Sequence, residues 1–97
     1  MTESIQSIKE KLTPIFKNHG VRKAILFGSY AKGEERENSD IDILVDSGLI
    51  GLDFFGLVGD VCDNMTKKID IFDVIEVKKG SNMEKEIENT GVVIYEQ

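Results

Sequence analysis

The residues best suited to chemistry lie in one stretch, GSYAKGEERENSDIDILVD, which runs from Gly28 to Asp46. Within it, Asp40 and Asp42 are two residues apart in an apolar run, so in a strand their side chains share one face, about 7 Å apart along the backbone. Carboxylates this close repel each other unless a cation lies between them, and Mg²⁺ or Mn²⁺ prefers such oxygen ligands. The pair therefore predicts a site for magnesium or manganese.

A glycine and a serine, Gly28 and Ser29, precede this pair. Gly28 lets the backbone approach a ligand, and Ser29 can cap a short helix whose free N–H groups attract phosphate. Lys32 could add a positive charge, or could equally be a solvated surface lysine. Alone, the turn or the acid pair could be purely structural, as a capped turn or a charged edge strand. Together they predict binding of a nucleoside triphosphate through its phosphates and magnesium.

The string GSYAKG followed by SDIDILVD resembles the signature of the DNA polymerase beta superfamily of nucleotidyltransferases, in which a glycine–serine turn precedes a D-x-D pair. The chain is short and the resemblance extends over nearly all of it, so it resembles the minimal nucleotidyltransferase (MNT) branch in particular. A motif in two parts is much more specific than D-x-D alone. The resemblance implies one domain over residues 1–97 with the α/β nucleotidyltransferase fold, a small mixed β-sheet flanked by helices.

The resemblance also implies a role for each residue of the motif. Gly28, Ser29 and Lys32 would bind the triphosphate. The family more often has arginine at the position of Lys32; lysine keeps the positive charge without the planar, two-pronged geometry of arginine. Asp40 and Asp42 would be catalytic and would bind two Mg²⁺ or Mn²⁺ ions.

Members of the family place a third carboxylate on a later strand, where it completes the second metal site and helps to deprotonate the attacking hydroxyl. The segment KKIDIFDV resembles this strand, and alignment of its I-D-I-F core selects Asp70, with Asp73 as the fallback. Asp70 could also simply pair with Lys67 or Lys68. The resemblance favours a catalytic and metal-binding Asp70.

The implied reaction is attack by an acceptor hydroxyl on the α-phosphorus of ATP or another nucleotide, with release of pyrophosphate. Members of the MNT branch commonly pair with a helical HEPN protein as antitoxin and toxin, and transfer AMP to a tyrosine of that partner. We therefore expect a protein adenylyltransferase that acts as an antitoxin. Two alternatives stay open: an antitoxin that acts by complex formation alone, and a small-molecule nucleotidyltransferase whose acceptor pocket spans a homodimer.

Composition narrows the class of protein. A net charge of −6 is the opposite of the basic balance that binding to long nucleic acids needs. The single cysteine, Cys62, excludes an intrachain disulfide framework and a cysteine-rich zinc site, and with only one histidine as well we expect no soft-metal chemistry. No apolar run approaches the roughly 18 to 20 residues that span a bilayer. We expect a soluble, cytoplasmic protein that binds neither membranes nor long nucleic acids.

The elements that must position the site follow from hydrophobic periodicity and turn residues. Helices are predicted over residues 2–19, 29–32, 52–65 and 82–89, strands over 22–27, 40–45, 68–77 and 92–95, and a loop over 34–39. Pro14 should kink or restart the first helix, with Thr13 as a cap. Residues predicted to share a buried face are Ile41, Ile43 and Val45 in one strand and Leu52, Phe55, Val58, Cys62 and Met65 in one helix.

Overall fold

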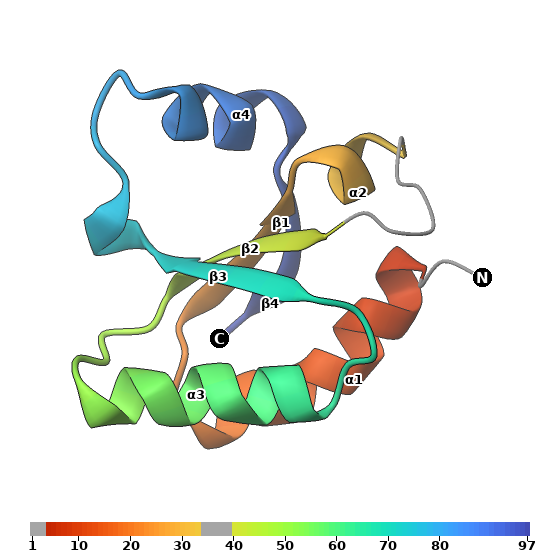
Figure 1. Cartoon of the computed structure of the whole chain (residues 1–97), viewed down its shortest axis with the longest axis vertical. Helices are drawn as coiled ribbons and strands as arrows, with labels where there is room; N and C mark the ends of the chain where they lie inside the picture. The colour runs from red at the N-terminus through yellow and green to blue at the C-terminus, as the bar shows by residue number, and fades with distance from the viewer. Residues whose placement is uncertain (1–3, 34–39) are drawn as a thin grey trace.

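The computed structural model describes residues 4–33 and 40–97, so the predicted loop over 34–39 lies outside the described residues. One mixed sheet forms the centre of the molecule, in the strand order β3-β2-β1-β4 (Figure 1). β1 is antiparallel to β2 and β4, whereas β2 is parallel to β3. The strands are β1 (Lys23–Phe27), β2 (Ile41–Asp46), β3 (Ile69–Asp73) and β4 (Val92–Glu96).

Helices cover both faces of this sheet, α1 and α3 on one side and α2 and α4 on the other (Figure 1). They are α1 (Ile5–Asn18), α2 (Ser29–Lys32), α3 (Leu52–Asp63) and α4 (Asn82–Thr90), and a short 3₁₀ helix η1 (Val74–Glu76) follows β3. The described helices include none long and apolar enough to cross a membrane. The predicted α/β fold, a small mixed sheet flanked by helices, is confirmed.

The hydrophobic core lies between the sheet and the pair α1 and α3. Its fully buried side chains include Ile8, Leu12 and Phe16 of α1, Leu57 and Val61 of α3, and Ile41, Ile43 and Val45 of β2. The predicted inward face of β2 is therefore confirmed. Because strand side chains alternate, the same burial turns Asp42 to the opposite face of the sheet, toward α4.

The first helix begins with a side-chain cap, since the Ser4 hydroxyl accepts a hydrogen bond from the Ser7 N–H at 3.0 Å. It then continues through Pro14 without a new start. The predicted cap at Thr13 is wrong, because the Thr13 hydroxyl donates to the Lys9 carbonyl at 2.6 Å, a bond made inside a continuous helix.

The predicted buried stripe of Leu52, Phe55, Val58, Cys62 and Met65 is wrong for three of its five residues, while Met65 is buried and Val58 is half-buried. Leu52 and Phe55 are 85% and 70% exposed, and Cys62 is also exposed. The face that packs on the sheet instead carries Leu57 and Val61. Apolar side chains occur on several faces of this helix, so the sequence period alone did not determine which face is buried.

The third strand ends four residues earlier than predicted. Asp73 ends β3, and its side chain accepts a hydrogen bond from the Ile75 N–H at 3.3 Å, which caps η1. The last helix and strand form close to their predicted positions. Ser81 caps α4 by accepting from the Glu84 N–H at 3.2 Å, and β4 pairs with β1.

Candidate functional site

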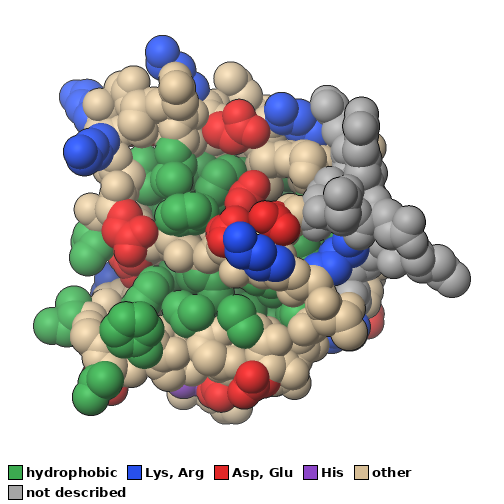
Figure 2. Space-filling model, viewed as in Figure 1, with side chains coloured by type: hydrophobic (Ala, Val, Ile, Leu, Met, Phe, Trp, Pro, Cys, Tyr) green, Lys and Arg blue, Asp and Glu red, His purple; other side chains and the backbone are tan. Residues whose placement is uncertain are grey.

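The three aspartates singled out by the sequence come together at one end of β2 and β3. Asp42 and Asp70 are partners in the parallel register of these strands, and Asp40 lies just before β2. The Lys68 ammonium lies between two of them, 3.8 Å from Asp40 Oδ2 and 3.9 Å from Asp70 Oδ1. Figure 2 shows this cluster of acidic side chains with a basic side chain against it, beside an apolar hollow.

Asp42 is the most perturbed of these carboxylates. Burial raises the pKa of Asp42 from its ordinary value of 3.8 to about 6, and repulsion from Asp70, Asp40 and Glu86 adds to the effect. The negative charge of Asp42 is therefore costly in this structure. A cation beside it would lower that cost, which is the electrostatic condition of a metal-binding carboxylate.

The donor set fits a hard divalent cation in chemical type, since three carboxylates offer only oxygen ligands. Within residues 4–33 and 40–97, no three His, Cys, Asp or Glu side chains already form a metal-binding group. Lys68 accounts for part of this, because its ammonium pairs with two of the three aspartates. The chemical type of these ligands fits Mg²⁺ or Mn²⁺, while Asp40 and Asp70 contact Lys68 in this structure.

The alternative third carboxylate, Asp73, has a structural role. It is only 4% exposed, and its carboxylate accepts hydrogen bonds from the hydroxyl and the N–H of Ser47. It thereby holds the segment after β2 against the end of β3. Asp73 pairs in register with Val45 rather than with Asp42, so Asp70 is the carboxylate beside the acid pair.

The glycine–serine turn lies against Asp42. Gly28 has φ +82° and ψ −153°, and a Cβ atom added there would lie 2.7 Å from Asp42 Oδ2. Only glycine permits both this backbone conformation and this approach. Gly28, not Ser29, occupies the cap position of α2, and no side-chain cap forms. The predicted capping role of Ser29 is therefore wrong, because the helix already begins at Ser29.

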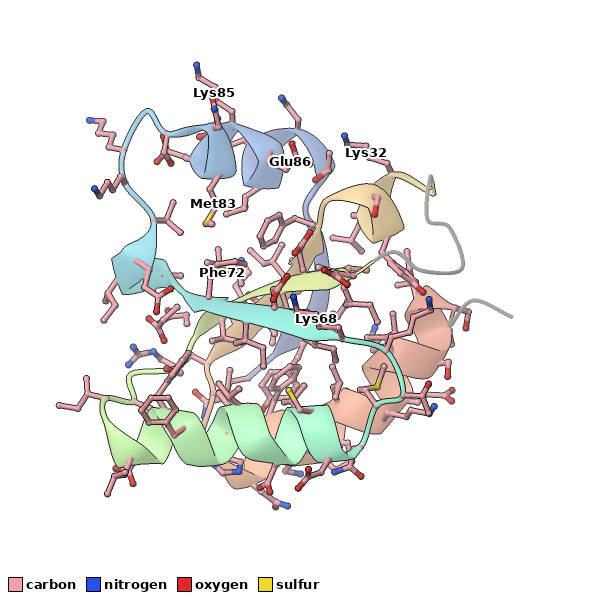
Figure 3. The ribbon with its side chains drawn as sticks, viewed as in Figure 1. Lys32, Lys68, Phe72, Met83, Lys85 and Glu86 are labelled. Atoms are coloured by element: carbon pink, nitrogen blue, oxygen red, sulfur yellow. The ribbon has the colours of Figure 1, made fainter. Side chains whose placement is uncertain are left out.

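Two residues of α4, which the sequence did not single out, contact Gly28 of this turn and Lys32 at the end of α2. The Gly28 N–H donates to Thr90 Oγ1 at 3.0 Å, and Lys32 Nζ lies 3.6 Å from Glu86 Oε1. In Figure 3, Glu86 and Lys32 lie on facing elements at the same end of the sheet. No local pattern distinguishes Glu86 from the other acids of α4, so only the tertiary arrangement identifies it.

A cavity of about 270 Å³ opens beside Asp42, between α4 and the sheet. It is lined by Phe27, Asp42, Phe72, Asn82, Met83 and Glu86. The Phe27 and Phe72 rings lie 6.1 Å apart at 49°, and Met83 points from α4 toward Phe72 (Figure 3). The site thus combines a charged end at the aspartates with an apolar hollow that could receive a side chain or a ring.

Residues 10–97 match the family model for polymerase beta nucleotidyltransferases. Over 48 residues the chain is 50% identical to a protein of Thermococcus cleftensis that bears the name protein adenylyltransferase MntA. That match covers 45% of this chain and 46% of the relative. The chain spans about half the length of the curated relatives it matches.

Solved structures share the fold. A toxin–antitoxin structure with AMP-PNP has a TM-score of 0.75 at 20% identity, and the match covers 92% of this chain and 73% of that chain. A structure of the tri-AMPylated Shewanella oneidensis HEPN toxin in complex with an MNT antitoxin has a TM-score of 0.71 at 18% identity, and covers 96% of this chain and 73% of that chain. At these identities the likeness establishes the fold alone.

Proposed function

Because the chain belongs to the polymerase beta nucleotidyltransferase family, we propose that it transfers AMP from ATP to a hydroxyl of a HEPN-domain protein, as the antitoxin of a toxin–antitoxin pair. The observation that carries this proposal is the pairing of Asp42 with Asp70 on adjacent strands, next to the Gly28 turn. The protein acceptor rests on a relative named protein adenylyltransferase and on a fold neighbour from a complex of an AMPylated HEPN toxin with an MNT antitoxin.

The roles proposed for the acids follow from their positions. Asp40, Asp42 and Asp70 would hold two Mg²⁺ or Mn²⁺ ions, which when bound supply charge stabilisation at the α-phosphate. Asp70 would also help to take the proton of the acceptor hydroxyl, since it stands on the strand beside Asp42. Lys68 would lose its contacts with the aspartates when the cations bind.

The triphosphate would lie at the other side of Asp42, along α2. Gly28 brings the turn close to Asp42, and Ser29 and Lys32 would contact the phosphates. Lys32 pairs with Glu86 in this structure, so it would exchange a carboxylate for phosphate oxygens.

The acceptor would approach through the cavity next to Asp42. Its apolar walls, from Phe27, Phe72 and Met83, suit a side chain with an apolar body and a terminal hydroxyl. The partner would supply the remaining contacts. An antitoxin that acts only by binding is the rival proposal, and the three neighbouring aspartates favour the enzyme.

The test is labelling of a co-expressed HEPN-type candidate with magnesium and α-labelled ATP, read by the intact mass of each protein. We expect AMP adducts on the candidate that disappear with Asp40→Asn and Asp42→Asn. Asp53→Asn, in the exposed first turn of α3, is the matched control and should leave labelling unchanged. A tight complex that carries no adduct with the wild-type protein would support the binding-only antitoxin instead.

A further inference from the structure

Thr90, the last residue of α4, contacts the turn that precedes the proposed phosphate site. We propose that Thr90 is a positioning residue for nucleotide binding: its hydroxyl holds the Gly28 turn against Asp42. This inference rests on the proposed function, because it concerns the same nucleotide site. Thr90 would not touch the nucleotide itself and would act through Gly28.

The hydrogen bonds of the Thr90 hydroxyl give it a defined orientation. It donates to the Glu86 carbonyl at 2.7 Å and accepts from the Gly28 N–H at 3.0 Å. A hydroxyl has one proton to donate, so the bond to Glu86 turns its lone pairs toward Gly28. The contact joins residues 62 positions apart in the sequence and is partly buried. It is therefore a tertiary contact and not part of a local turn.

The Gly28 N–H has few other means of pairing. Gly28 lies between the end of β1 and the start of α2, in a backbone conformation that neither element uses. A buried N–H without a partner costs about as much as a lost hydrogen bond. Thr90 supplies that partner, and the turn stays within contact distance of Asp42.

A second contact links the same two elements. Glu86, one helical turn before Thr90, pairs with Lys32 at the far end of α2. Helix α4 thus contacts the residue just before α2, Gly28, and the last residue of α2, Lys32. No residue of α4 is fully buried, so these polar contacts make up a larger share of its attachment than they would for a core helix. Binding sites need groups placed to within about 0.5 Å, which makes this attachment relevant to affinity.

Another threonine provides a matched control. Thr13 of α1 donates to the Lys9 carbonyl at 2.6 Å, the same bond to the residue four positions earlier that Thr90 makes. Thr13 lies in a helix on the opposite face of the sheet (Figure 1). Replacing it tests the loss of a helical threonine hydroxyl without touching the turn.

The experiment compares Thr90→Val, Thr90→Ser and Thr13→Val. Amide hydrogen exchange at Gly28 is followed by NMR, and the dissociation constant for Mg·ATP is measured by calorimetry, both well below the melting temperature of each variant. For Thr90→Val we expect exchange at Gly28 to be about tenfold faster and Mg·ATP binding about tenfold weaker, as loss of one hydrogen bond predicts. Thr90→Ser keeps the hydroxyl and should stay within about threefold of wild type in both, as should Thr13→Val.

Several results would overturn the proposal. Free exchange of the Gly28 amide in the wild-type protein would overturn it, and this measurement holds even if Thr90→Val fails to fold. Unchanged Mg·ATP affinity in folded Thr90→Val would also overturn it. A third contrary result would be a Thr90→Ser variant that loses as much Mg·ATP affinity as Thr90→Val. A wild-type protein that binds no Mg·ATP would instead refute the proposed function, and the role of Thr90 with it. The two failures differ because only the second is a wild-type protein that does not bind Mg·ATP.

Discussion

The charge of Asp42 should make the folded protein less stable at neutral pH than it would be without that charge. Burial and the neighbouring carboxylates raise the pKa of Asp42 to about 6 in the folded state, against an ordinary value of 3.8. The folded protein therefore binds this proton more tightly than the unfolded chain does. The resulting stabilisation is fully present below pH 3.8 and is lost as the pH rises through 6.

Asp42→Asn tests this cost directly, because asparagine keeps the shape of the side chain and removes the charge. One pKa unit corresponds to about 1.4 kcal/mol, so the upper limit of the cost is about 3 kcal/mol. Solvent screening of a side chain that is only partly buried reduces this to about 1 to 2 kcal/mol. At pH 7.5 we expect the free energy of unfolding of Asp42→Asn to exceed that of wild type by this amount, and the difference to vanish below pH 3.8.

Urea denaturation of both proteins, in EDTA and at a series of pH values, provides the measurement. Magnesium should then stabilise the wild-type protein and not the variant, because the proposed ligand is gone. Asp53→Asn, which removes an exposed charge on α3, should match the wild-type protein both in its stability and in its stabilisation by magnesium. Equal or lower stability of Asp42→Asn at pH 7.5 in EDTA would refute the electrostatic reasoning.

Three further substitutions test other parts of the site. Gly28→Ala should lower the free energy of unfolding by about 1 to 3 kcal/mol, because the added Cβ meets Asp42 in a backbone conformation that alanine avoids; unchanged urea denaturation would contradict this. Asp73→Ala should cost about 2 to 4 kcal/mol by leaving Ser47 without its buried acceptor, measured by thermal unfolding, while magnesium binding to the remaining protein persists. Lys68→Gln should bind Mg²⁺ several-fold more tightly in calorimetric titrations, because the ammonium no longer competes for two carboxylates, and weaker binding would argue against that competition.

Local sequence patterns were sufficient for most elements of the fold. The order of helices and strands and the inward face of β2 followed from hydrophobic alternation, because one face of that strand packs on a core and the other does not. The face of α3 did not follow, since apolar side chains such as Leu52 and Phe55 lie outside the packed stripe. The end of β3 was misplaced because the cap formed by Asp73 depends on side-chain geometry that hydrophobicity does not record.

The site shows the same division between local and tertiary information. Asp40 and Asp42 are close in the sequence, so their proximity could be predicted from strand geometry. Asp70 was selected by resemblance, and the parallel register of β2 and β3 places it beside Asp42. Glu86 and Thr90 could not be predicted, because their contacts with Lys32 and Gly28 arise only when α4 packs over the sheet.

The helices on the two faces of the sheet differ in how deeply their apolar side chains are buried. The fully buried side chains of α1 and α3 lie on one face, whereas α4 on the other face has none. Most of the free energy of folding that comes from apolar burial is therefore generated on the side away from the aspartates. We therefore expect exposed positions around the cavity to tolerate substitution at a modest cost in stability, which leaves this surface free to diverge during evolution.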